Sequence, residues 1–125
     1  MEMAFSLHSN LAMILSMLKI KPLPSKRQQI IDVLKTVQNQ AVLIQDCMVS
    51  EIYQTTDLST IFYLEQWRKK EALHRHIESN LFMRVLTVMD LSIEAPEISF
   101  PEITAVRAMD LVSALREFPN SEKTI

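Results

Sequence analysis

The residue with the greatest capacity for chemistry is His76, in a segment whose apolar spacing predicts a helix over residues 70–78. At about 100° per residue, His76 falls between Ala72 and Leu73 on the apolar side of this helix. Imidazole exchanges protons near neutral pH, so His76 is a candidate catalytic residue, as a general base or as a group that orients a substrate carbonyl or hydroxyl. The other interpretation is a histidine at the edge of the core that hydrogen-bonds a backbone carbonyl. The sequence leaves both open.

The strand predicted just before this helix, over residues 60–67, carries three candidate substrate contacts on one face. Trp67 either stacks on a flat aromatic substrate or fills core volume. Glu65 is harder to place in a core, because a buried carboxylate is rarely unpaired. It either pairs with a basic residue across a dimer contact or flanks a pocket. Tyr63 offers a hydroxyl donor on the same face.

Tyr53 is a fourth candidate substrate contact, on a strand predicted over residues 47–55, where strict alternation places it on the same face as Cys47. Cys47 has no neighbouring base in the sequence, so a small buried apolar side chain is a better interpretation than a catalytic thiol. His74 lies about 200° from His76 around the helix, which places it on the surface and prevents the two from sharing a metal. We therefore expect no metal site.

The elements that position these residues follow the order β-α-β-β-α-β, which predicts an α+β fold of the ferredoxin-like type, with a four-stranded antiparallel sheet and two helices on one face. The remaining predicted elements are a strand over 12–21, a helix over 26–40 that begins with a Ser25–Gln28 capping box, a break at 79–80, a helical continuation over 81–91 and a short edge strand over 97–100.

The chain is predicted to be a single domain over residues 1–125, because its length supports one modest core. The ferredoxin-like core is expected over residues 11–103. An additional amphipathic C-terminal helix is predicted over 104–118, and we expect it to reinforce a dimer. The last residues, 120–125, are predicted to form a frayed tail.

Composition narrows the classes of function. A net charge of −2 argues against a nucleic-acid surface, and no apolar run reaches the length of a membrane span, about 18 residues. The single cysteine excludes an internal disulfide and favours a cytoplasmic protein. The chain contains no glycine, which excludes the Gly-rich motifs that bind nucleotides. We expect no cofactor.

The strand–helix block over residues 60–82 resembles that of the antibiotic-biosynthesis-monooxygenase-like family, whose members are dimeric α+β barrels. The matching residues are Glu65, Trp67, Glu71, Ala72, Leu73, His76, Ser79 and Phe82. The resemblance implies a homodimer and a pocket between sheet and helices. It also implies a cofactor-independent monooxygenase, in which a small aromatic or quinol-like substrate uses its own electron-rich ring to activate oxygen.

The chain departs from the resembled family at several positions. A haem-degrading branch uses an asparagine on the first strand with a tryptophan and a histidine at the second helix, where this chain has Ser16, His76 and Leu86. Haem degradation is therefore disfavoured. Lys69 replaces the usual polar cap of the second helix, and Leu81 replaces a frequent histidine. These losses weaken the prediction of an enzyme and leave open the alternative, a non-catalytic dimeric module of the same fold that binds a ligand or a protein.

Overall fold

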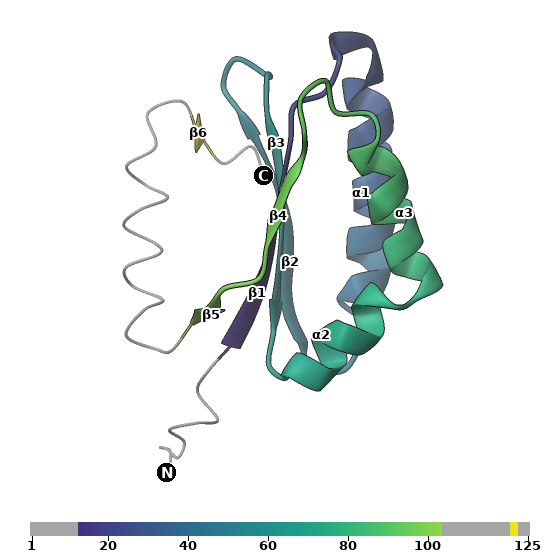
Figure 1. Ribbon diagram of the computed structural model, residues 1–125, viewed down its shortest axis with the longest axis vertical. Helices are drawn as coiled ribbons and strands as arrows, with labels where there is room; N and C mark the ends of the chain where they lie inside the picture. Colours follow the sequence, from purple (N-terminus) through teal and green to yellow (C-terminus); the bar gives the residue numbers. More distant parts are fainter. Residues whose placement is uncertain (1–12, 104–120, 123–125) are drawn as a thin grey trace.

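The computed structural model describes residues 13–103 and 121–122, and its centre is an antiparallel sheet. The strands follow the order β4-β1-β3-β2-β6, and β5 also pairs with β1 (Figure 1). Their bounds are β1 (Met13–Ile20), β2 (Cys47–Thr55), β3 (Ile61–Trp67), β4 (Glu97–Ser99), β5 (Glu102–Ile103) and β6 (Ser121–Glu122). Strands β1 to β4 form the predicted four-stranded sheet, so the ferredoxin-like α+β fold is confirmed.

Helices α1 (Arg27–Ala41), α2 (Lys70–Ile77) and α3 (Asn80–Met89) all lie on one face of this sheet (Figure 1). Helices α1 and α3 pack side by side along the strands, whereas α2 crosses the end of the sheet where β3 finishes. The predicted break falls at Ser79, which has an extended backbone and accepts a hydrogen bond from the Phe82 amide at 3.2 Å. This N-cap starts α3 in a new direction.

Two apolar clusters fill the space between the sheet and the helices. The larger cluster lies under α1 and α3 and contains Leu18, Ile20, Ile30, Ile31, Leu34, Val37, Ile52, Ile61, Tyr63, Phe82, Val85 and Val88. The smaller cluster lies under α2 and contains Ile14, Trp67, Ala72 and Leu73. Each large apolar side chain buried in this way contributes about 1.5–3 kcal/mol, so these clusters hold the helices on the sheet.

A β-bulge at the start of β2 overturns one prediction. The register of β2 against β3 shifts between Cys47 and Val49, so Cys47 lies opposite Trp67 on the face that the helices cover. Tyr53 lies opposite Phe62 on the other face. The prediction that Cys47 and Tyr53 share a face is therefore wrong, because the extra residue of a bulge reverses the alternation on one side of it.

Two tight turns take positive φ without glycine. Asp46, directly before the bulge, has φ 74°, and Leu58, in the turn between β2 and β3, has φ 64°. An aspartate visits this region readily, whereas a leucine there costs about 1–2 kcal/mol. The Leu58 turn is held by Asp57, whose carboxylate accepts hydrogen bonds from the Thr55 hydroxyl at 2.8 Å and the Ser59 amide at 3.0 Å.

The ends of two elements also differ from the predictions. No side chain caps α1, so the expected Ser25–Gln28 capping box is not formed. A 3-10 turn, η2 (Pro24–Lys26), leads the backbone into α1 instead, and the Lys26 amide donates to the Leu23 carbonyl at 2.8 Å. In the predicted tail, β6 pairs with β2 at Gln54 and Thr55, which covers backbone groups that an edge strand leaves unpaired. The helix predicted over 104–118 lies outside the described residues.

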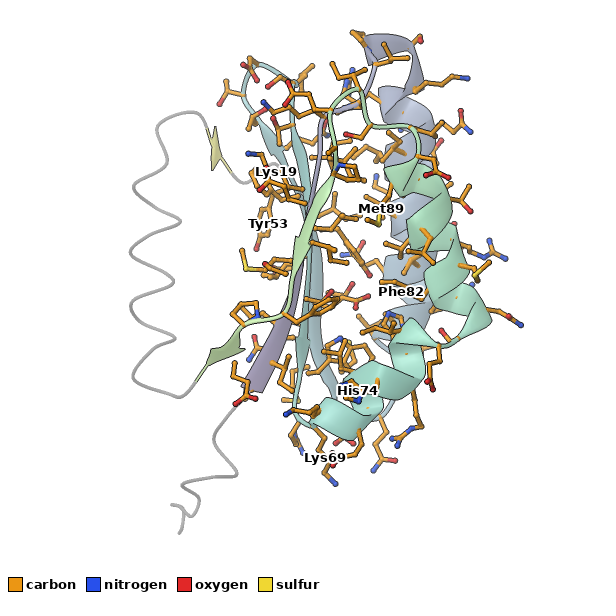
Figure 2. The ribbon with its side chains drawn as sticks, viewed as in Figure 1. Lys19, Tyr53, Lys69, His74, Phe82 and Met89 are labelled. Atoms are coloured by element: carbon orange, nitrogen blue, oxygen red, sulfur yellow. The ribbon has the colours of Figure 1, made fainter. Side chains whose placement is uncertain are left out.

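The face of the sheet away from the helices carries several apolar side chains beside the polar Lys19, Glu51 and Gln66, and no helix among the described residues covers it. We call this surface the open sheet face. Figure 2 shows Tyr53 and Lys19 on this side, and Phe82 and Met89 between the sheet and the helices. Its partly exposed apolar side chains are Met13, Met17, Val49, Tyr53, Phe62 and Leu64.

Candidate functional site

The candidate site is centred on Glu65, whose side chain is buried in the middle of β3 and faces the helices. Glu65 is 0% exposed. Strand pairing places Ser16 of β1 and Ser50 of β2 on either side of it, and both serines are buried. Ser16, Glu65 and Ser50 thus form one polar row across the three strands, and the neighbouring cross-strand rows on the same face are mainly apolar. The row marks a polar site inside an apolar core.

Three side chains bind the Glu65 carboxylate. The Tyr63 hydroxyl donates to Oε2 at 2.7 Å, the Trp67 indole donates from Nε1 to Oε1 at 3.2 Å, and His76 Nε2 lies 3.1 Å from Oε2. The Ser50 hydroxyl lies 2.8 Å from the Tyr63 hydroxyl and extends the chain of hydrogen bonds. We call these five residues the Glu65 cluster. They come from β2, β3 and α2, so the cluster ties α2 to the sheet.

Two groups near Glu65 have a raised pKa. Burial, followed by the nearby Glu65 charge, raises the pKa of the Tyr63 hydroxyl above its ordinary value. The same two causes raise the pKa of the Cys47 thiol from 9.0 to about 11, and the Val49 carbonyl, which accepts a hydrogen bond from Cys47, only partly opposes them. Both groups therefore stay protonated at neutral pH. Cys47 packs against the small cluster under α2 as a neutral side chain, but it is partly buried rather than fully buried as predicted.

His76 is enclosed by aromatic rings. Its side chain is 0% exposed, and its ring lies 4.8 Å from the Trp67 ring at a tilt of 34° and 5.5 Å from the Phe82 ring, edge to face. Nε2 faces Glu65, whereas Nδ1 is buried with no hydrogen-bond partner. The position on the apolar side of the helix agrees with the helical spacing. The hydrogen-bond partner is the Glu65 carboxylate rather than a backbone carbonyl.

The structure brings four of the predicted site residues together and separates the fifth. His76, Trp67, Tyr63 and Glu65 form one hydrogen-bonded group. Tyr53 lies on the open sheet face, where its hydroxyl donates to the Glu51 carboxylate. Glu65 finds its partner within the chain, in His76, and not across a dimer contact as one interpretation expected. His74 is exposed.

Ser50 and Ser16 are the members of this site that the sequence analysis did not select. Serine is common in strands and carries no functional signal alone. The available signal was the β2–β3 hairpin, because a hairpin register places a residue of β2 directly opposite Glu65. Pairing between β1 and β3 connects segments far apart in the sequence, so Ser16 had no such local signal.

In residues 13–103 and 121–122, no group of three His, Cys, Asp or Glu side chains is placed to hold a metal ion. None of the helices in this part of the chain is both long and apolar enough to cross a membrane.

Comparison with known proteins gives relatives of the fold. No protein-family model matches the sequence, and no curated protein matches it. A conserved protein from Methanosarcina mazei Go1 is 20% identical over 74% of this chain and 93% of its own, with a TM-score of 0.67. A candidate antibiotic biosynthesis monooxygenase from Nitrosomonas europaea is 15% identical over 71% of this chain and 88% of its own, with a TM-score of 0.65.

A second candidate antibiotic biosynthesis monooxygenase, from Deinococcus radiodurans, is 12% identical over 72% of this chain and 91% of its own, with a TM-score of 0.65. The predicted resemblance to structures of this kind is therefore confirmed. At these identities the likeness establishes the fold, and the reaction has to be argued from the site itself.

Proposed function

We propose that this protein is a cofactor-independent monooxygenase that acts on a small aromatic or quinol-like substrate. The observation that carries the proposal is the buried pair of Glu65 and His76, whose nitrogen and oxygen are 3.1 Å apart inside the core. Buried ionisable groups with a specific partner are enriched at functional sites. The structures of the same fold that are candidate antibiotic biosynthesis monooxygenases support the same class of reaction.

The proposed reaction requires from the protein a base and an apolar environment for the substrate. A base removes a proton from the substrate, and the electron-rich anion reduces O2. One oxygen atom stays in the product and the other leaves as water together with the two hydrogen atoms that the substrate loses. His76 is the candidate base, and Trp67 and Phe82 offer flat apolar contacts beside it. Tyr63 and Glu65 complete the polar side of the site, and Tyr53 has no part in it because it lies on the opposite face.

The test is oxygen transfer to naphthohydroquinone under heavy-isotope oxygen gas. We expect the product to gain one heavy oxygen atom at a rate above that of the reagent alone. His76→Ala should abolish this gain, whereas His74→Ala, two residues away on the exposed side of the same helix, should retain it. Product that lacks the heavy atom, or equal rates for the two variants, would refute the proposal.

The second candidate function is a non-catalytic dimeric module, and the open sheet face favours it. A sheet face with several partly exposed apolar side chains is a common contact surface, and a two-fold pairing of sheets would bury those side chains in both copies. The homodimer belongs to both proposals. The near-complete burial of His76 and Trp67 supports the module, because in this state side chains occupy the space that a substrate would need.

Two substitutions to glutamate test the dimer. Leu64 lies on the open sheet face, and Leu86 is 43% exposed on α3, away from it. Light scattering at micromolar concentration should give a dimer for the unaltered chain and for Leu86→Glu, and a monomer for Leu64→Glu. A monomeric unaltered chain, or a dimer that Leu64→Glu leaves intact, would contradict sheet-to-sheet pairing.

A further inference from the structure

His76 holds an unsatisfied hydrogen-bonding atom inside the protein. Nδ1 is buried and has no partner, although Nε2 of the same ring is bound to Glu65. Buried polar atoms nearly always have a partner, so an exception points to a missing water or ligand group, or to a functional role. Turning the ring over would move Nε2 away from Glu65 and break their contact at 3.1 Å. The orphan atom is thus fixed in place by the cluster.

The cluster also determines which nitrogen carries the proton. Trp67 Nε1 is a donor only, and the Tyr63 hydroxyl donates to Oε2, so both are matched to an ionised, accepting carboxylate. An ionised carboxylate can only accept, so the hydrogen between the two side chains lies on His76 Nε2 when Glu65 is ionised. In neutral imidazole the other nitrogen then holds a lone pair. Nδ1 is an acceptor that lacks a donor.

The surroundings define the class of ligand that supplies this donor. Burial, and after it the Glu65 charge, raises the pKa of the Tyr63 hydroxyl and of the Cys47 thiol, so both effects disfavour a second negative charge nearby. An anionic ligand is therefore disfavoured. The rings of Trp67 and Phe82 beside His76 suit a flat apolar body. The ligand that matches both conditions is a neutral phenol or hydroquinone, whose O–H group donates to Nδ1.

We propose that Glu65 is a positioning residue that holds His76 with Nδ1 as the proton acceptor for a neutral phenolic O–H group. In the proton transfer, the phenol O–H bond breaks, its electron pair stays on oxygen, and a new N–H bond forms at Nδ1. The imidazolium ring that results lies between two anions, the phenolate and Glu65. The carboxylate thus stabilises the cationic ring without exchanging the proton itself. The inference rests on the proposed function only for the later reaction with O2.

Nitrogen NMR of histidine-labelled protein tests the protonation pattern directly. In the unaltered chain at neutral pH, we expect the hydrogen of His76 on Nε2 and an unprotonated Nδ1. Exposed His74 serves as the reference within the same spectrum. A hydrogen on Nδ1 of His76 in the resting protein would overturn the inference, and this measurement requires no substitution.

Glu65→Gln tests the positioning role. The amide oxygen can still accept from Trp67 Nε1, but the amide nitrogen now presents a donor to His76 Nε2. The ring should respond by moving its hydrogen to Nδ1, a change that loss of packing alone does not produce. If His76 keeps its hydrogen on Nε2 in this variant, Glu65 does not set the tautomer.

Hydroquinone and its dimethyl ether test the ligand class. Hydroquinone should shift the Nδ1 signal of His76, and the ether, which has the same ring without an O–H group, should not. Equal effects of the two compounds, or none from hydroquinone, would overturn the ligand assignment. Hydroquinone bound at Nδ1 without oxygen transfer would refute the monooxygenase alone, whereas oxygen transfer by a protein with Nδ1 protonated at rest would refute this inference alone.

Discussion

Replacing Glu65 and His76 by leucine, singly and together, measures how strongly the buried pair is coupled. His76→Leu removes one hydrogen-bond donor and leaves a buried carboxylate with Tyr63 and Trp67 only. Losing a hydrogen bond to a buried charged group costs about 1.5–3 kcal/mol of the free energy of unfolding. Glu65→Leu leaves the Trp67 and His76 donors without an acceptor, at about 1–3 kcal/mol each, while the Tyr63 hydroxyl can turn to Ser50.

The double variant should be much less destabilised than the two losses added together. With both polar groups gone, only the Trp67 indole is left without its acceptor, so we expect a loss of about 1–3 kcal/mol. The coupling energy from the cycle is then roughly 2.5 kcal/mol or more. Urea unfolding at neutral pH and one fixed protein concentration measures all four proteins, and exposed His74→Leu is the control for helix propensity. Losses that add to within about 0.5 kcal/mol would refute a coupled pair.

Three further predictions concern charge and backbone strain. Folding raises the pKa of the Cys47 thiol and of the Tyr63 hydroxyl, so the unfolded chain releases these protons at lower pH. The free energy of unfolding measured by urea should therefore fall as pH rises above 9.0, the ordinary pKa of the thiol. A flat profile to pH 11 would contradict the burial of both groups. Burial and, after it, the Glu65 charge raise the pKa of Cys47 from 9.0 to about 11. Glu65→Gln removes the second of these causes, so a thiol reagent at pH 9.0 should react faster with this variant, and an unchanged rate would exclude that charge as a cause. Leu58→Gly removes the strain of a leucine at positive φ and should raise the free energy of unfolding by about 0.5–1 kcal/mol after the entropy cost of glycine. Leu43→Gly, at an exposed position with ordinary φ, should lower the free energy of unfolding.

The sequence was informative wherever structure is set by local periodicity. The alternation in residues 60–67 predicts which side chains of β3 face the helices, and the structure buries Tyr63, Glu65 and Trp67 there. The spacing of three and four around Ala72, Leu73 and His76 likewise places the histidine on the inner side of α2. These assignments need only the geometry of a single strand or helix.

Pairing between elements was not predictable in the same way. The bulge beside Cys47 inserts one residue into the ladder, and no pattern within β2 reveals it. The partner of Glu65 depends on how α2 crosses the end of the sheet, which follows from the break at Ser79 and from packing. Periodicity could place both Glu65 and His76 toward the core, but only the assembled structure brings their side chains together.

The way in which the short helix α2 is attached to the sheet determines when His76 can be reached from solvent. Its buried side chains are Ala72, Leu73 and His76, so one of the three groups that fasten it to the sheet is also the candidate base. Any excursion that lifts α2 from β3 pulls His76 away from Glu65 and admits water to the carboxylate. A molecule from solvent then enters while α2 is lifted, and proton transfer at Nδ1 follows only after the contact between Glu65 and His76 has formed again. The rate at which α2 returns to the sheet sets an upper bound on how often the cluster can act.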